Sequence, residues 1–233
     1  MPKKPTGKTG PIRMSNNGIK RELVEFPAQK EQIEQMIAEL FVKTMDGHQD
    51  DLKPFSNLKM NRQNDVDFLI DTSLGTIELE LTEFAPLRQL GITKHIDAPS
   101  DYSVGDMTDM AMELILKKSN HYGTTKKILV IYKTQSEFLI TYPVIDLLRR
   151  RLSPSSINFL KIYFLSPHGN TGASVSLVYP AKPHGFYEHL SDESLAANRL
   201  SIGFKKFRRV IQFGGYQISV PSSQIKVNFK VLP

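Results

Sequence analysis

The sequence predicts an α/β protein with a central mixed β-sheet flanked by helices. Three kinds of pattern support this fold class. Apolar residues recur at helical spacing in three segments, residues 27–46, 103–122 and 141–152. Polar and apolar residues alternate over residues 64–70 and 76–83, which predicts a strand hairpin. Continuous apolar runs at 126–133 and 158–165 are typical of strands covered on both faces, so helices and strands alternate along the chain.

The amino-terminal part predicts an arm followed by a helix. Residues 1–21 carry six Lys or Arg and no acidic residue, and they contain few apolar residues. Such a composition cannot repay the entropy of folding, so we expect a flexible basic arm. Pro27 suits the first turn of the first helix, which should end at Asp46-Gly47. Residues 48–62 should form a loop, with a short strand near residues 57–60.

The rest of the chain continues the alternation and then changes character. Ser103 or Asp106 is the expected start of the second helix, and Thr141, with Pro143 close behind, that of the third. From residue 171 onward, short strands with a Gly214-Gly215 hairpin turn are expected, together with a short helix. We therefore expect an arm (1–21), a core (22–170) and a β-rich carboxyl-terminal extension of the same domain (171–233).

Composition narrows the possible classes of protein. With 233 residues, 40% of them hydrophobic, the chain can bury one large core. The chain has no cysteine, which excludes disulfides, thiolate catalysis and sulfur-ligated zinc. No apolar run is long enough to cross a bilayer, and no apolar segment follows the basic start. We therefore expect a cytoplasmic protein with no membrane partner.

The net charge of +6 hides a strong segregation along the chain. Residues 22–113 hold seven basic and nineteen acidic residues, a net charge of −12, whereas residues 114–193 hold ten and five. Residues 194–233 hold seven basic residues and no acidic one. This asymmetry suits a cation site beside a surface for a polyanion.

The hairpin carries the candidate metal ligands. If its strands pair antiparallel, Val66, Phe68 and Ile70 lie on the apolar face, and Asp67, Glu78 and Glu80 share the other face. Three carboxylates on adjacent strands repel one another unless water or a cation screens them, and Mg²⁺ takes oxygen ligands of this kind. The alternative is an ordinary solvated face of a hairpin. The acidic neighbours Asp65, Asp71 and Glu83 lie nearer strand ends, where solvation is expected.

Residues 27–165 resemble the PD-(D/E)XK nuclease superfamily, which includes restriction endonucleases. Its core runs helix, strand hairpin, strand, helix, strand, with an Asp on the second strand and an acidic-x-Lys motif on the third. Asp67 and Glu78-Leu79-Glu80 match this pattern, with Glu80 in place of the usual Lys and Glu34 as the acidic residue of the first helix. The resemblance implies a restriction-endonuclease-like core.

The resemblance also implies roles for these residues. Asp67 and Glu78 would hold Mg²⁺, or Mn²⁺, at the scissile phosphate, and Glu80 would bind a second ion or act as a base. Glu34 would complete the site. Because a Glu cannot replace the positive charge of a Lys, a two-metal scheme is the more natural one.

Several basic clusters could contact DNA, namely Lys117-Lys118, Lys126-Lys127, Arg149 to Arg151 and Lys205-Lys206-Phe207-Arg208-Arg209. We favour Lys205, Lys206, Arg208 and Arg209, which lie beside an aromatic residue and a hairpin. For each cluster the alternative is a solvated face.

These expectations combine into a metal-dependent DNA endonuclease of the restriction–modification type, possibly a homodimer. One alternative is a catalytically impaired module on the same fold that binds nucleic acid or serves in assembly. Another is a metal hydrolase of a small phosphoester. Cleavage of a plasmid would select the first function, and salt-sensitive binding without cleavage would select the second. The third predicts an intact plasmid and no strong salt effect on binding.

Overall fold

The structure is a computed structural model that covers the whole chain and is described here for most of it. The described residues are 12–15, 18–21, 24–61, 66–92, 101–121, 127–135, 138, 140–168, 172–183, 185–201, 208–213, 216–221 and 228–231. Side chains are described from Val24 to Arg199 within these ranges.

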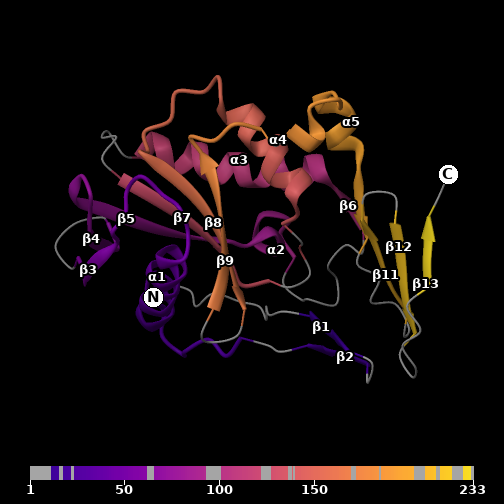
Figure 1. The fold of residues 1–233 in the computed structure, drawn as a ribbon, viewed down its shortest axis with the longest axis horizontal. Coiled ribbons are helices and arrows are strands. Elements are labelled where there is room, and N and C mark those ends of the chain that lie inside the picture. Colours follow the sequence, from indigo (N-terminus) through magenta and orange to yellow (C-terminus); the bar gives the residue numbers. More distant parts are fainter. Residues whose placement is uncertain are drawn as a thin grey trace.

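A six-stranded mixed sheet forms the centre of the molecule, which confirms the predicted fold class (Figure 1). In spatial order its strands are β3 (Ser56–Met60), β4 (Phe68–Thr72), β5 (Gly75–Phe84), β7 (Lys127–Lys133), β8 (Lys161–His168) and β9 (Gly172–Tyr179). Strand β4 is antiparallel to β3 and β5, whereas β5, β7 and β8 are parallel. Strand β9 is antiparallel to β8, so the sheet extends past residue 170, into residues that the sequence analysis assigned to the extension.

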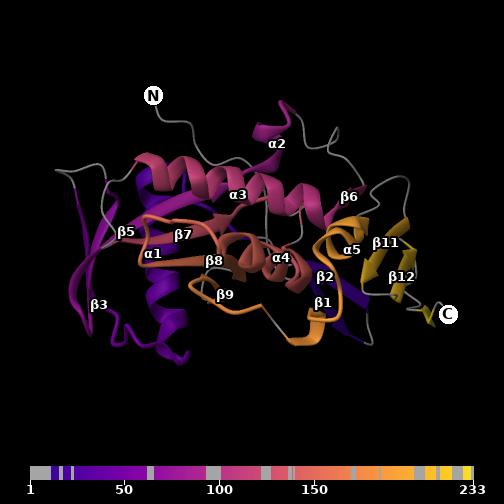
Figure 2. The same cartoon turned by 90° about the horizontal axis from the view of Figure 1, so that it is seen from above.

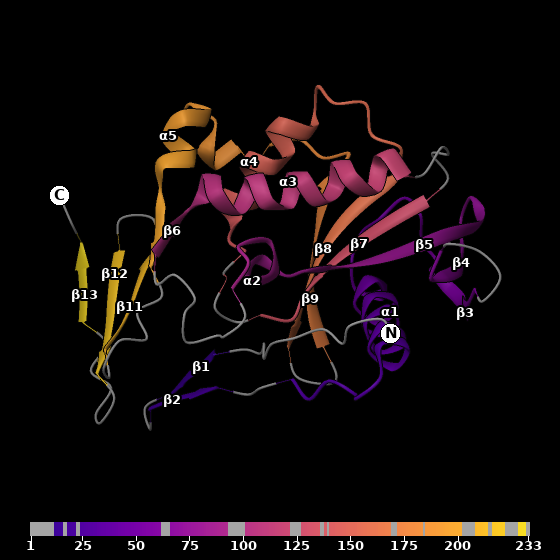
Figure 3. The ribbon, with the colours of Figure 1, turned by 180° about the vertical axis from the view of Figure 1, so that it is seen from behind.

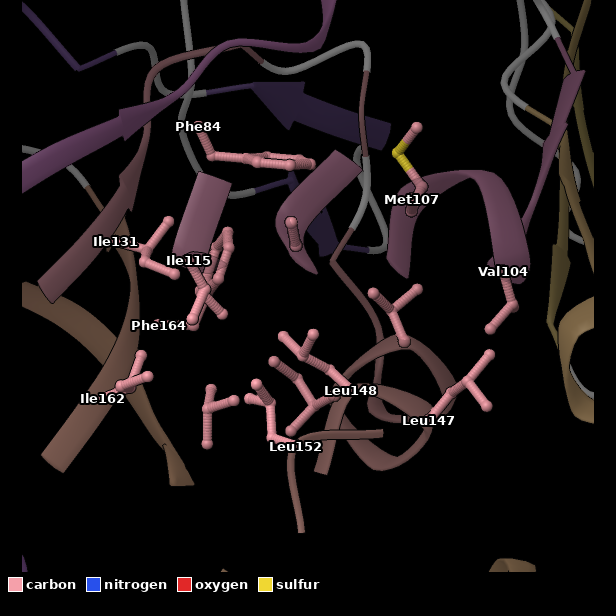
Figure 4. Packing of buried hydrophobic residues seen from close by; sticks show 14 of the residues in the cluster. Phe84, Val104, Met107, Ile115, Ile131, Leu147, Leu148, Leu152, Ile162 and Phe164 are labelled. Carbon is pink, nitrogen blue, oxygen red and sulfur yellow. The ribbon is translucent and has the colours of Figure 1, made fainter. Parts of the chain in front are cut away.

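Helices cover both faces of this sheet. Helix α1 (Lys30–Asp46) packs on one face, and α3 (Val104–His121) and α4 (Tyr142–Leu152) cover the other (Figures 1 and 3). Helices α3 and α4 also pack against each other (Figure 2). Figure 4 shows the core on the α3 side, where Leu148 and Ile115 meet Ile131 and Phe164 of the sheet. This double cover explains why β7 is buried along its whole length and apolar between its terminal lysines.

The helix starts follow the sequence signals closely, with one exception. Helix α3 begins after Ser103, where the Ser103 hydroxyl accepts from the Asp106 N–H (2.9 Å) and the Asp106 carboxylate accepts from the Ser103 N–H (2.7 Å). Helix α4 begins after Thr141, as predicted. Helix α1 begins at Lys30 rather than at Pro27, because Gln29 is still extended and the chain before it packs Phe26 against the core.

The strands also match their predicted positions, apart from the start of β8. The hairpin of β4 and β5 is antiparallel, with Gly75 at a φ of +92° after its two-residue turn, and the short strand near residues 57–60 is β3. Strand β8 begins three residues later than expected. Asn158 is instead used to fix α3, since its N–H donates to the Ser119 hydroxyl (2.8 Å) and its side-chain amide to the Ser119 carbonyl (3.0 Å).

Other elements were not predicted. Within the residues expected to form a flexible arm, β1 (Ile12–Ser15) and β2 (Gly18–Arg21) pair antiparallel. Helix α2 (Pro86–Gln89) follows β5, and β6 (Asp101–Ser103) pairs with β10 (Arg199–Ser201). In the carboxyl-terminal region η2 (Gly185–Tyr187) was not predicted either, whereas α5 (Asp192–Ala197) is the short helix expected there. The short strands expected there are β11 (Arg208–Phe213), β12 (Tyr216–Pro221) and β13 (Asn228–Val231), which form a three-stranded sheet. Strands β11 and β12 pair antiparallel as predicted, but Gly214-Gly215 lies outside the described residues.

Among the residues that the structure describes, no helix is both long enough and apolar enough to cross a membrane.

Candidate functional site

Asp67 and Glu80 stand opposite one another where β4 separates from β5. The paired register runs Phe68 to Leu79 and Leu69 to Glu78, so Asp67 lies one residue beyond the paired segment, across from Glu80. The Leu81 N–H donates to the Asp67 carboxylate (2.8 Å). The Asp67 side chain thus replaces a backbone carbonyl as acceptor where the pairing of the two strands ends. Directly opposed residues place their Cβ atoms about 5 Å apart in an antiparallel pair. The register thus brings together two of the three strand carboxylates that the sequence analysis singled out.

Helix α3 supplies a lysine to this pair. The Lys118 ammonium donates to the Glu80 carboxylate. Glu80 is only 2% exposed to solvent. The next residue along the helix, Ser119, is held by both hydrogen bonds from Asn158, which fix this turn of α3 over the sheet. Lys118 is therefore oriented by the fold, and it is not one of the freely solvated lysines of a surface cluster.

Burial raises the pKa of Asp67 above its ordinary value. The hydrogen bond from Leu81 opposes this rise, as do the positive charges of Lys30 and Lys118. Lys30 comes from α1 and Lys118 from α3, so the Asp67 carboxylate feels cations from both sides of the sheet. A buried carboxylate with a raised pKa is a recognised mark of a functional site.

Glu34 on α1 lies in the same neighbourhood. It forms an ion pair with Lys30 one turn earlier (2.7 Å) and is largely buried. Burial raises the pKa of Glu34, and the negative charge of Asp67 raises it further. The structure thus places Glu34 near Asp67, as the sequence analysis expected.

Glu78 is occupied differently. It stands opposite Lys127, the first residue of β7, and the two side chains form an ion pair. Glu78 remains 30% exposed, in contrast to Glu80. Across the described ranges, no three Asp, Glu or His side chains are arranged to hold a metal ion together. A Mg²⁺ ion needs only one or two protein carboxylates when water and phosphate supply the other ligands, so the pair of Asp67 and Glu80 fits that minimal set.

The expectation that Glu83 is solvated is wrong. Its side chain is 8% exposed, and its two oxygens accept hydrogen bonds from Arg88 (3.0 Å) and from the Thr134 hydroxyl. Glu83 faces Tyr132 across the parallel pair of β5 and β7. Glu83 is buried because this part of the sheet is covered, although the residue lies near the end of β5.

Sequence reasoning did not assign Lys118, Lys30 or Glu83 to the site. Lys118 lies 38 residues from Glu80 in the sequence. Its dipeptide, Lys117-Lys118, is typical of a solvated surface cluster. The only sequence signal for it is the motif position at residue 80, where the resemblance expects a lysine and the chain has Glu.

The favoured DNA-binding residues cannot be placed. Lys205 and Lys206 lie outside the described residues, and for Arg208 and Arg209 only the backbone of β11 is described. In the cluster of residues 149–151, Arg149 donates to the Leu177 carbonyl (2.6 and 3.0 Å), and Arg150 donates to the carbonyls of Tyr187 (2.6 Å) and Leu190 (2.8 Å). These two arginines hold β9 and η2 in place.

Comparison of the chain with protein-family models, with curated proteins and with solved structures found no match in any of the three.

Proposed function

We propose that this protein is a metal-dependent endonuclease that hydrolyses phosphodiester bonds in DNA. The observation that carries the proposal is the facing pair of Asp67 and Glu80 with the Lys118 ammonium on the Glu80 carboxylate. The order of α1, β3 to β5, α3 and β7 supports it, because this is the order that the resemblance to PD-(D/E)XK nucleases implies.

The proposal assigns a role to each residue. Asp67 and Glu80 hold Mg²⁺, or Mn²⁺, against the scissile phosphate, and Lys118 places a positive charge beside them. When bound, the metal ion polarises the phosphoryl group and stabilises the charge that develops during in-line displacement. Glu34 accepts a proton from the attacking water, a task suited to a carboxylate whose pKa is raised.

Lys118 favours a one-metal scheme over the two-metal scheme expected from the sequence. That expectation rested on the absence of a lysine at residue 80. Because α3 delivers an ammonium to the Glu80 carboxylate, the missing positive charge is present in space. Glu78 lies outside this proposed site, because the register places it opposite Leu69 rather than Asp67 and its carboxylate is paired with Lys127 at the start of β7.

Cleavage of a supercoiled plasmid by the purified chain, with Mg²⁺, Mn²⁺ or EDTA, tests the proposal. We expect metal-dependent cleavage that falls to the EDTA background in Asp67→Asn, Glu80→Gln and Lys118→Ala. Glu78→Gln is the matched control because it removes the same charge two residues away on the same strand. It should retain cleavage.

Two outcomes would contradict this assignment. An inactive wild-type chain in both metals would refute the endonuclease function. Loss of activity in Glu78→Gln, with full activity in Glu80→Gln, would restore the ligand set expected from the sequence and remove Lys118 from the site.

A second candidate function is a DNA-binding module with an impaired site. It is favoured by the lysine pairs, since both motif glutamates are neutralised by Lys118 and Lys127. This function predicts salt-sensitive binding of a DNA duplex with no cleavage in either metal.

The partner, assembly and location form the remaining parts of the proposal. DNA is the partner, a homodimer cuts both strands, and the setting is a cytoplasmic restriction–modification system. Light scattering of the protein with and without a duplex gives the mass of the assembly and checks the dimer.

A further inference from the structure

Lys118 binds the same carboxylate to which the proposed function assigns a metal ion. Its ammonium donates to a Glu80 oxygen, and the Glu80 side chain is 3% exposed. A carboxylate buried to this extent needs a compensating charge, because its ionised form has lost most of its hydration. In the free protein, Lys118 supplies that charge.

Two features allow the Lys118 ammonium to leave Glu80 without disturbing the fold. The lysine side chain is 30% exposed, so solvent reaches part of its length. The turn of α3 that carries it is held separately, since Ser119 accepts two hydrogen bonds from Asn158. The long and flexible lysine side chain can therefore swing toward solvent while its Cα stays in place.

The neighbouring pair of Lys127 and Glu78 shows the opposite order of burial. Here the lysine side chain is 9% exposed and the glutamate side chain 30% exposed. Because water reaches the Glu78 carboxylate, its charge does not depend on Lys127 for compensation. Glu78 lies two residues before Glu80 on the same face of β5, so this pair is a matched control for the Glu80 pair.

We propose that Lys118 is a competitor for the metal ion within the chain, whose ammonium holds the Glu80 carboxylate in the free protein and is released toward solvent when a cation binds to Asp67 and Glu80. Two cations against one buried carboxylate repel each other strongly, because their surroundings screen charge weakly. The positive charge of Lys118 acts on Asp67 as well. This inference rests on the metal site of the proposed function, and it gives Lys118 control over the affinity of that site.

Titration calorimetry with Mg²⁺ or Mn²⁺ in the absence of DNA measures the competition. Lys118→Met removes the ammonium and keeps an unbranched side chain. We expect this variant to bind the metal about tenfold more tightly than the wild type, because no ammonium has to be displaced. Lys127→Met removes the ammonium of the neighbouring pair and should bind the metal as the wild type does.

Thermal unfolding in EDTA and in Mg²⁺ gives a second measurement that is independent of cleavage. Lys118→Met leaves the buried Glu80 carboxylate uncompensated, so its unfolding temperature should fall in EDTA. Mg²⁺ should raise that temperature by more than it does in the wild type, and Lys127→Met should show no such extra gain. Lys118→Gln keeps a hydrogen-bond donor without the charge, and it takes the place of Lys118→Met in both measurements if that variant fails to fold.

The outcomes separate the role of Lys118 from the endonuclease function. Equal or weaker metal binding by the Lys118 variant overturns the competition and leaves the function standing. Binding by the variant with none by the wild type supports the competition but overturns the endonuclease function, since the wild-type chain then keeps its own lysine in place of the metal. Binding by neither chain overturns both.

Discussion

Two clusters of charged residues lie against the same sheet, and they differ in how their carboxylates are satisfied. In the first, the Asp50 cluster, Asp50 accepts from the Lys161 ammonium (2.8 Å), the Tyr163 hydroxyl (2.7 Å) and the Leu52 N–H (2.9 Å). These hydrogen bonds and the charge of Lys161 outweigh burial, so the pKa of Asp50 is lowered.

The second, the Asp67 cluster, contains Asp67, Glu34, Glu80 and Lys118. Here burial prevails, and the pKa values of Asp67 and Glu34 are raised. The Asp50 cluster therefore stabilises the fold, whereas burial disfavours the ionised forms of Asp67 and Glu34 in the Asp67 cluster. Residues kept at such a cost are candidates for a function, because a bound cation or phosphate ligand would offset it.

The largest effect on stability should come from Asp50→Ala. This substitution leaves the buried Lys161 with the exposed Asp51 as its remaining partner and removes the acceptor of Tyr163. Breaking a buried pair from one side costs about 3–5 kcal/mol, and we expect the free energy of unfolding in urea to fall by about that amount.

Asp51→Ala is the control for this change. Asp51 pairs with the same lysine, but its side chain is 81% exposed, so its loss should cost less than about 1 kcal/mol. Equal losses of unfolding free energy in Asp50→Ala and Asp51→Ala would show that the buried hydrogen bonds of Asp50 add no stability. The contrast with the Asp67 cluster would then not hold.

The pH dependence of stability should differ in sign between the clusters. The folded pKa of Asp67 is raised, so its contribution to stability is fully present below the unfolded pKa near 3.8 and is lost as pH rises through the folded pKa. The folded pKa of Asp50 is lowered, so its contribution is present above 3.8 and is lost as pH falls through the folded pKa. Asp67→Asn should therefore gain stability relative to the wild type as pH rises toward 7, and Asp50→Asn should lose it.

Urea unfolding of the wild type and both variants at several pH values between 3 and 7 measures how the free energy of unfolding changes with pH in each. Asparagine can still accept the Leu81 N–H at position 67, so Asp67→Asn isolates the charge. If Asp67→Asn is less stable than the wild type at pH 7, the negative charge of Asp67 is already balanced by neighbouring groups in the free protein. Ionised Asp67 would then carry no free-energy cost for a ligand to offset.

The sequence predicted the sheet, its helices and the approach of Asp67 to Glu80, because these depend on local periodicity and on the pairing of adjacent strands. The alternation in β4 and β5 decides which side chains face which way, and a short turn decides the register. Strand β8 begins later than predicted because Asn158 hydrogen-bonds to Ser119 of α3. No local sequence pattern indicates this long-range contact.

The sequence could not predict the cations, because they arrive from distant elements. Lys118 reaches Glu80 from a helix 38 residues further along the chain. Lys30 pairs with Glu34 within α1, but its charge acts on Asp67 only because α1 packs on the sheet. The pairing of β6 with β10, whose Asp101 and Arg199 lie 98 residues apart, is equally invisible to periodicity. Tertiary packing supplies the positive charge that the motif lacks at residue 80.

The smallest effect should separate the two buried phenols. Tyr163→Phe removes one hydrogen bond to the Asp50 carboxylate, so the free energy of unfolding should fall by about 1 kcal/mol. Tyr132→Phe removes a hydroxyl with no hydrogen bond in the described part of the chain, so it should cost nothing or slightly stabilise the protein. Urea unfolding of both variants under one buffer condition gives the comparison directly. An equal loss in Tyr132→Phe would mean that its hydroxyl already has a partner and that the two phenols do not differ in this respect.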